Sequence, residues 1–400
     1  MRNHHFSNFY FFYFTTIGII VPYWSLYLKH LGFTAMQIGE LMAILLLTKV
    51  IAPNLWATLA DHAAIKHGNS LAILRTATTM TLVCYLLTAF ANNYWSMALG
   101  MFAFCVFWNA CLPQMEAATL NQLDNKREKY GEIRLWGSIG FIVSVLGVGA
   151  LIDATGPEDI FLAGAVSMSA MFLASFWLVH HVRKKRMLEV VDLEHMQKKK
   201  PLKELLNRRI VIMLVLCLFM QMSHSPFYTF YSIYLESYGY TKLQIGILWS
   251  SGVVFEIFIF LIGYRLLRRY QLTSLLSFTF FVAALRWFLV AAYPENLSIM
   301  FSAQIMHAIT YGLYHVVMIQ LIDRFFVGRY QIRGQALYSS ITFGLGGAVG
   351  SMASGYVWSY YGQTNLFWVV SLMMLCVAIL SIFLLDDKVR DDHTHVTQIK

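Results

Sequence analysis

Ionisable side chains are rare within the long apolar stretches of this 400-residue sequence. Eight of them stand well inside such stretches: Lys49, Glu116, Arg134, His224, Glu256, Arg286, His307 and His315. A charge near the centre of a bilayer costs at least about 2.5 to 3.5 kcal/mol on insertion scales, so such residues tend to face a cavity and to have a function. If these stretches span a membrane, the eight residues are the candidates for binding and proton chemistry.

Glu256, Arg286 and His307 are expected at similar, central depths. Burial favours the protonated form of a carboxyl group and a nearby Arg favours the ionised form, so movement of the Arg can switch between the two. We expect a proton-coupling site with Glu256 as the carrier, tuned by Arg286 and His307. The alternative is a static buried ion pair that only fixes helix packing.

His307, Tyr311 and His315 recur at intervals of four residues, which places them on one face of a helix and makes Tyr311 a candidate contact for a substrate. For His315 a structural hydrogen bond to a neighbouring helix is the alternative. His224 stands just before Pro226, where the sequence predicts a helix break whose free carbonyl groups line a cavity.

Lys49 is a candidate cation for an anionic substrate, although it can also snorkel to the membrane surface or pair structurally. Aromatic residues are dense at 10–14 and 227–234. Most are expected to pack or to anchor at the membrane interface, and a minority facing a cavity would favour a flat or aromatic substrate.

The composition supports the membrane interpretation. Hydrophobic residues make up 58% of the chain and charged residues only 13%, too few to cover a water-facing surface. Each span needs about 20 apolar residues, and twelve spans fit the length. We predict an all-α membrane protein with helices at 7–28, 37–60, 71–91, 95–119, 133–154, 160–180, 209–235, 242–264, 272–292, 297–322, 334–357 and 366–385.

The basic residues predict the orientation. With the N-terminus inside, the cytoplasmic segments hold 26 of the 30 Lys and Arg residues, and the opposite side holds only Lys29 and Lys242. Both termini are therefore expected in the cytoplasm. The stretch 1–28 is expected to be a retained first helix, because it is too long and lacks a small-residue cleavage site typical of a secretory signal.

The basic segment 181–208 separates six predicted spans from six, so we expect an N-terminal half at 1–180 and a C-terminal half at 209–400. The segment is interpreted as a solvated cytoplasmic linker; binding to anionic lipid or to a regulatory partner is the alternative. The halves repeat: YLKHLGFTAMQIGEL from Tyr27 matches YLESYGYTKLQIGIL from Tyr234 at an offset of 207, with eight of fifteen positions identical. Parallel six-helix repeats are typical of alternating-access transporters, with the substrate held where the halves meet.

These features resemble the major facilitator superfamily over essentially the whole length. The run ATLADHAAIKHGNSLAILR from Ala57 is similar to a degenerate form of its G-x-L-A-D-R-x-G-R-K loop. The resemblance implies that Asp61 is a gate residue.

The runs PQMEAATL from Pro113 and YGEIRLWGSIGF from Tyr130 are similar to the lactose permease-like symporters. That resemblance implies a substrate-binding charge pair of Glu116 and Arg134 and a stacking aromatic at Phe141, where those symporters have tryptophan. It also implies that Glu256, Arg286 and His307 match their proton site, with a threonine in place of the second carboxylate.

The runs RLWGS from Arg134 and LWSSGVVFEIFIF from Leu248, together with the Arg286-Trp287 pair, resemble the phenylpropionate permease family. This likeness implies uptake of an aromatic carboxylic acid, such as 3-phenylpropionate, with protons across a bacterial inner membrane. A sugar or nucleoside symporter is the alternative, and a drug exporter is less favoured.

Other functional classes lack support in the sequence. An enzyme would need a nucleophile with a base, or clustered metal ligands, and a receptor would need a larger soluble domain. The five cysteines stand in apolar segments without C-x-x-C spacing, so neither disulfides nor a metal site are expected. We expect no cofactor and no nucleic-acid partner, because the net charge of +9 reflects topology. The chain is expected to act as a monomer on a small solute and a proton.

Overall fold

The computed structural model describes residues 4–67, 70–123, 129–178 and 207–385, and within these ranges every regular element is helical. The first six helices are α1 His4–His30, α2 Ala35–His67, α3 Ser70–Leu87, α4 Tyr94–Leu123, α5 Tyr130–Thr155 and α6 Asp159–Phe176, with a 3-10 turn η1 at Thr88–Phe90. The rest are α9 Arg208–Ser237, α10 Lys242–Arg269, α11 Leu272–Ala292, α12 Leu297–His307, α13 Tyr314–Phe325, α14 Gln331–Ser339, α15 Gly347–Tyr361 and α16 Gln363–Leu384, with turns η3 Ala308–Leu313, η4 Gly328–Tyr330 and η5 Ser340–Gly346. The predicted all-α fold class is confirmed.

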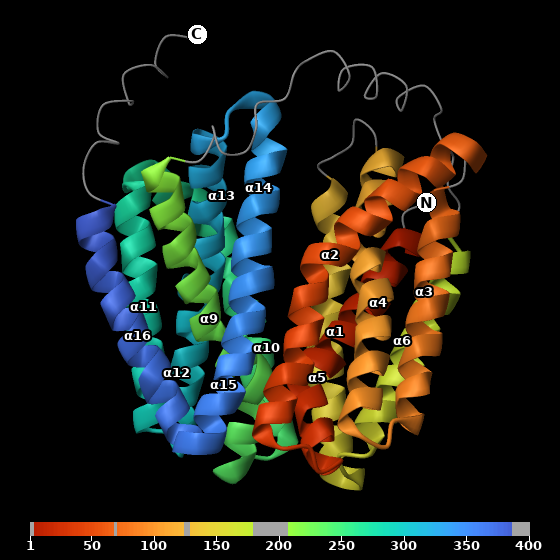
Figure 1. Ribbon diagram of the computed structural model, residues 1–400, viewed down its shortest axis with the longest axis horizontal. Helices are drawn as coiled ribbons and strands as arrows, with labels where there is room; N and C mark the ends of the chain where they lie inside the picture. Colours follow the sequence, from red (N-terminus) through yellow and green to blue (C-terminus); the bar gives the residue numbers. More distant parts are fainter. Residues whose placement is uncertain (1–3, 68–69, 124–128, 179–206, 386–400) are drawn as a thin grey trace.

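Figure 1 shows α1–α6 (red to yellow) and α9–α16 (green to blue) as two groups of helices, which we call the N-terminal and C-terminal helices. α1 begins and α16 ends at one side of the bundle, which we call the terminal side. The two groups approach each other at the opposite side, where α1 ends at His30 and α9 ends at Ser237. The predicted linker at 181–208 lies almost wholly outside the described residues.

The described chain has eleven helices that are long and apolar enough to cross a membrane. The other predicted span corresponds to 331–361, which is less apolar because Gly and Ser are frequent in it. Large apolar side chains cover the outer surface, among them Phe383 at 74% exposure and Leu261 at 72%. A surface of this kind suits contact with hydrocarbon and is far more apolar than a soluble monomer exposes.

Two of the predicted uninterrupted helices contain a π turn. The predicted helix 297–322 consists of α12, the π turn η3 and α13, and the predicted helix 334–357 consists of α14, the π turn η5 and α15. A π turn inserts one extra residue into a helix and is frequent at functional sites. The polar pattern of the sequence gives no sign of this insertion, and both turns lie in the C-terminal helices.

Equivalent glycines of the repeat make close backbone contacts between the two groups of helices. A Cβ on Gly39 of α2 would lie 2.7 Å from the carbonyl oxygen of Ser351 in α15. A Cβ on Gly246 of α10 would likewise lie 2.7 Å from the carbonyl oxygen of Val145 in α5. Both crossings therefore need glycine, which explains its recurrence at the offset of 207.

An ion pair and backbone hydrogen bonds join the two groups at the side opposite the terminal side. Glu236 of α9 contacts Lys29 of α1 at 2.7 Å and Lys242 of α10 at 2.9 Å. The carboxylate of Asp153 in α5 accepts the backbone N–H groups of Lys242 and Leu243 at 2.8 and 2.9 Å, at the positive end of α10. We call Lys29, Glu236, Lys242 and Asp153 the latch.

Substitution of Glu236 by Gln should loosen the latch. It removes at nearly constant size the ion pair with Lys29, which joins the two groups, and a pair of this exposure is worth about 0.5 to 1 kcal/mol, so conformations open at this side should gain about two- to fivefold. A cysteine at the buried Ser351, in a chain lacking the five native cysteines, should then react faster with a water-soluble maleimide.

Glu158→Gln is the matched control for this experiment, because Glu158 lies at the same side but takes no part in the latch. Its labelling rate should equal that of the parent protein. If Glu236→Gln and Glu158→Gln behave alike, the latch does not hold this side closed.

Candidate functional site

Arg286 of α11 is fully buried at the centre of the C-terminal helices. Its Nε donates to the carbonyl oxygen of Ala303 at 2.9 Å, and its Nη1 donates to Thr310 Oγ1 at 3.5 Å. The guanidinium carbon lies 4.7 Å from the ring centroid of Phe227 and 4.2 Å from that of Trp287. Its Nη2 has no partner. The guanidinium is thus held by rings and neutral oxygens, without an ion pair among the described residues.

Thr310 connects Arg286 to His224. His224 Nδ1 lies 2.9 Å from the carbonyl oxygen of Met220 and must donate to it, so His224 Nε2 accepts the hydroxyl of Thr310 at 3.2 Å. The same hydroxyl oxygen accepts from Arg286 Nη1. Thr310, which the resemblance presents only as the replacement of a carboxylate, is therefore a hydrogen-bonding centre that the sequence analysis missed.

The helix break predicted at Pro226 is wrong. α9 continues as an α-helix from Arg208 to Ser237 with Pro226 inside it. The carbonyl groups near it are used by local side chains: Met220 O accepts from His224 and from Ser223, and Gln221 O accepts from Ser225. His224 is consequently a buried, hydrogen-bonded residue of the helix and not part of an unwound segment.

The histidine and tyrosine stripe of the sequence follows one face through the π turn η3. The rings of His307 and Tyr311 are stacked, with centroids 5.3 Å apart and planes at 12°. Tyr311 and His315 both pack near Phe343 of η5, at 6.5 and 6.2 Å. The Nδ1 atoms of His307 and His315 have no hydrogen-bond partner, so the structural hydrogen bond considered for His315 is not made through this atom.

Glu256 does not pair with Arg286. In the described chain Glu256 has no ion pair or hydrogen bond; its Cγ lies 3.2 Å from where a Cβ on Gly312 would stand, so the side chain faces η3. The cation within electrostatic range of its carboxylate is Arg134, which belongs to the N-terminal helices. The alternative of a static Glu256–Arg286 ion pair is therefore absent from this conformation.

Arg134 of α5 lies over an aromatic ring and is the cation that acts on two carboxylates. Its guanidinium carbon is 3.9 Å from the ring centroid of Phe14, and it is within electrostatic range of both Glu116 and Glu256. Glu116 accepts a hydrogen bond from the Tyr130 hydroxyl at 3.4 Å. The implied charge pair of Glu116 and Arg134 is not closed to ion-pair distance in the described chain, so Arg134 is shared between the two groups of helices.

Lys49 is exposed on α2. At 100° per residue it lies opposite the exposed apolar residues Leu47, Ile51 and Leu55, which suit lipid contact. Lys49 therefore faces away from the lipid-facing side of α2. Asp61 lies within α2, but its side chain is outside the described part of the chain, so its gate role stays a prediction.

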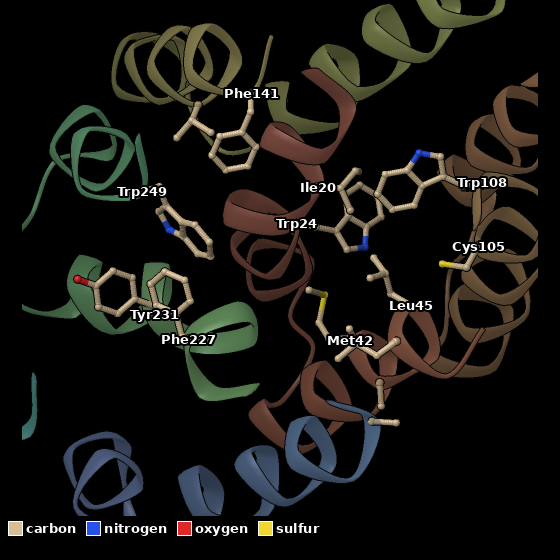
Figure 2. Packing of buried hydrophobic residues seen from close by; sticks show 14 of the residues in the cluster. Ile20, Trp24, Met42, Leu45, Cys105, Trp108, Phe141, Phe227, Tyr231 and Trp249 are labelled. Atoms are coloured by element: carbon tan, nitrogen blue, oxygen red, sulfur yellow. The ribbon is translucent and has the colours of Figure 1, made fainter. Parts of the chain in front are cut away.

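Aromatic side chains from both groups of helices face one another near these charges (Figure 2). Phe141 of α5 lies on one side, and Phe227, Tyr231 and Trp249 lie on the other. Trp24 of α1 points away from them, toward α4, where its Nε1 donates to Met101 Sδ. The rings of Phe227 and Trp249 are 4.2 Å apart. The sequence analysis identified Phe141 and the aromatic density of α1 and α9, but it missed Trp249, which stands in the LWSS run used only for the resemblance.

Gln304 of α12 is a second residue that the sequence analysis missed. It is fully buried, and its Nε2 lies 2.7 Å from the Tyr231 hydroxyl, whereas its Oε1 has no partner. A signal was present, because Gln304 precedes His307 by three residues and so shares its helix face. Gln304 carries no charge, so the criterion of ionisable residues within apolar stretches does not select it.

The sequence is similar to known proteins over nearly its whole length. The model of the MFS_1 like family matches residues 4–369. A probable 3-phenylpropionic acid transporter of Escherichia coli (strain K12) is 27% identical over 369 residues, covering 92% of this chain and 93% of that protein. A maltose permease of Geobacillus stearothermophilus is 25% identical over 354 residues, covering 88% and 86%.

Solved structures agree on the fold. The crystal structure of the nucleoside transporter NupG has a TM-score of 0.81 at 17% identity and covers 96% of this chain and 99% of that one. That of a D-xylose-proton symporter has a TM-score of 0.67 at 12% identity, covering 94% and 95%. The chain is therefore similar to whole transporters and not to a fragment of one.

Substitution of Thr310 by Val tests the hydrogen-bonding centre. The variant leaves Arg286 Nη1 and His224 Nε2 without their partner, and a buried polar group left unpaired costs about 1 to 3 kcal/mol. The melting temperature of the purified protein should fall by several degrees.

Thr76→Val serves as the control, because the Thr76 hydroxyl is exposed and bonds only its own helix at Ala72. An unchanged melting temperature in Thr310→Val would show that Arg286 Nη1 and His224 Nε2 find other hydrogen-bond partners.

Proposed function

We propose that this protein is a proton-coupled symporter that imports a small aromatic carboxylic acid by alternating access. The chain belongs to the MFS_1 like family, whose members are membrane transporters and not enzymes. The proposed sides follow from the basic residues, with both termini in the cytoplasm of a bacterium and the spans in its inner membrane. The transporter is proposed to act as a monomer.

The observation that carries proton coupling is the environment of Glu256. This carboxylate stands within a membrane-spanning helix without a hydrogen bond or ion pair in the described chain, and the cation acting on it belongs to the other group of helices. A carboxylate without a partner loses its charge by binding a proton. Because rocking of the two groups moves Arg134 relative to Glu256, the affinity for that proton changes with the conformation.

The aromatic residues of both groups support an aromatic solute. Phe141 faces Phe227, Tyr231 and Trp249 across the interface, and flat rings stack favourably on such side chains. The probable 3-phenylpropionic acid transporter among the relatives is named for a molecule of this type. The proposed contacts of the solute with charged and polar groups are Lys49, Glu116, Arg134, His224, Tyr311 and His315.

The latch suggests the direction of access in this conformation. An ion pair, backbone hydrogen bonds and glycine crossings hold the side opposite the terminal side closed. With both termini in the cytoplasm, this is the conformation in which the imported solute would be released inward. Asp61, at the far end of α2, is proposed to stabilise closure of the other side in the second conformation.

A sugar or nucleoside symporter is the second candidate. The maltose permease among the relatives is 25% identical, and the carboxylate of Glu116 is suited to accept hydroxyl groups of a sugar. A drug exporter has less support, because the quinolone resistance proteins among the relatives match only 60% of the chain.

Substrate choice is tested by uptake into proteoliposomes. Radiolabelled 3-phenylpropionate should accumulate saturably when the external pH is lowered, and excess unlabelled acid should compete while maltose and uridine should not. Competition by maltose or uridine without uptake of the acid would favour the second candidate.

Proton coupling is tested with Glu256→Gln. The amide cannot carry a proton, so accumulation driven by a pH gradient should be lost while exchange of labelled for unlabelled acid continues. Glu40→Gln is a matched control. Glu40 belongs to α2 and not to α10, and it lies near the latch side, where its carboxylate accepts a hydrogen bond from Tyr94. Undiminished uphill uptake by Glu256→Gln would refute the assigned role.

A further inference from the structure

We infer that the carboxylate of the transported acid is bound inside the C-terminal helices by Arg286, together with His307 and Gln304, behind the ring of Phe227. This inference rests on the proposed function, since it names where an anionic solute is held. It also separates two roles: Arg286 serves the solute anion, and Glu256 serves the proton.

The charge of Arg286 requires an anion at some stage of the transport cycle. The side chain is fully buried and cannot lose its proton in a protein. Two of its three nitrogens donate to neutral oxygens, of Ala303 and Thr310, and Nη2 has no partner. A buried charge that lacks a counter-ion is strongly unfavourable, and Glu256, the carboxylate that the sequence predicts beside it, does not pair with it.

Two more unpartnered polar atoms belong to α12, the helix that Arg286 contacts at the carbonyl oxygen of Ala303. His307 Nδ1 and one amide atom of Gln304 are buried without hydrogen bonds. Both side chains border the same small notch, because a Cβ on Gly252 would lie 3.3 Å from Gln304 Oε1 and 3.4 Å from His307 Cδ2. The Tyr231 hydroxyl can pair with either amide atom of Gln304, so the free one can be a donor. A guanidinium, an imidazole and an amide are together a suitable donor set for a carboxylate.

Phe227 connects this donor set to the aromatic residues at the interface. Its ring centroid lies 4.7 Å from the Arg286 guanidinium carbon and 5.2 Å from the His307 ring on one side. It lies 4.2 Å from the Trp249 ring and 4.9 Å from the Tyr231 ring on the other. Displacement of the Phe227 side chain would open a path for the solute. The carboxylate of the solute would then reach Arg286 while the aromatic ring of the solute stacks on Trp249, which suits an acid with a short spacer between ring and carboxylate.

The two other intramembrane cations fit the anion less well. Arg134 has the carboxylate of Glu116 within electrostatic range in its own group of helices, and its guanidinium lies over the ring of Phe14. Lys49 is exposed on α2, whereas Arg286 is fully buried beside the rings of Phe227 and Trp287. Arg286 is thus the fully buried cation for which the described chain supplies no counter-ion.

The test compares binding of 3-phenylpropionate with binding of its neutral amide, 3-phenylpropanamide, to purified protein by calorimetry. In Arg286→Gln the affinity for the acid should fall about tenfold or more, as expected for loss of a charged hydrogen bond, while the affinity for the amide changes little. The preference for acid over amide should therefore disappear. Arg75→Gln is the control, because Arg75 is a half-buried arginine of α3 that donates to the carbonyl oxygens of Ser175 and Leu178 and has no proposed contact with the solute; it should keep that preference.

A second variant keeps the test decisive if Arg286→Gln fails to fold. Gln304→Glu is nearly isosteric and gives Arg286 a counter-ion from within the protein. It should raise the melting temperature without ligand and abolish binding of the acid but not of the amide. Gln320→Glu, at an exposed position of α13, is the control and should do neither.

The outcomes separate this inference from the proposed function. If the unmodified protein binds neither compound, the proposed aromatic acid function fails. If it prefers the acid and Arg286→Gln or Gln304→Glu preserves that preference, the anion site assigned here is wrong although the function stands. Loss of the preference in Arg134→Gln instead would assign the anion to the N-terminal helices.

Discussion

The interior of this transporter is organised around a positive charge that its own carboxylates do not neutralise. Arg286 lies where water cannot solvate it, and rings and neutral oxygens hold it in place. The neighbouring groups are arranged accordingly: Thr310 links the guanidinium to His224, and Phe227 screens it from the interface. A protein carboxylate at this place would neutralise the Arg286 charge permanently, and the carboxylate of a solute could then no longer pair with it.

Much of the fold could be predicted because it depends on local properties. Apolar length defines the spans, and in the case of 272–292 the predicted bounds coincide with those observed. The glycines of the repeat, Gly39 and Gly246, could be recognised from identity at one offset, and the structure shows their physical reason in two close backbone crossings. Such features depend on short segments of sequence and can therefore be predicted from them.

The arrangement of the site could be predicted only in part, because depth along a helix is readable from sequence and rotation about its axis is not. Glu256 and Arg286 were expected to meet at similar depth, yet Glu256 faces Gly312 and Arg286 reaches Ala303. The π turn η3 changes the rotation further without any mark in the polar pattern. Thr310 carries no charge and so drew no attention, although it makes the central hydrogen bonds.

The ion pair between Lys29 and Glu236 carries a consequence for the history of the chain. These residues occupy equivalent positions of the repeat, at the offset of 207, and meet across the approximate two-fold axis. In a symmetric dimer of identical six-helix units, this position would set two lysines or two glutamates against each other, which is repulsive. The attraction exists only because the repeats diverged, so neither unit could now be exchanged for a second copy of the other.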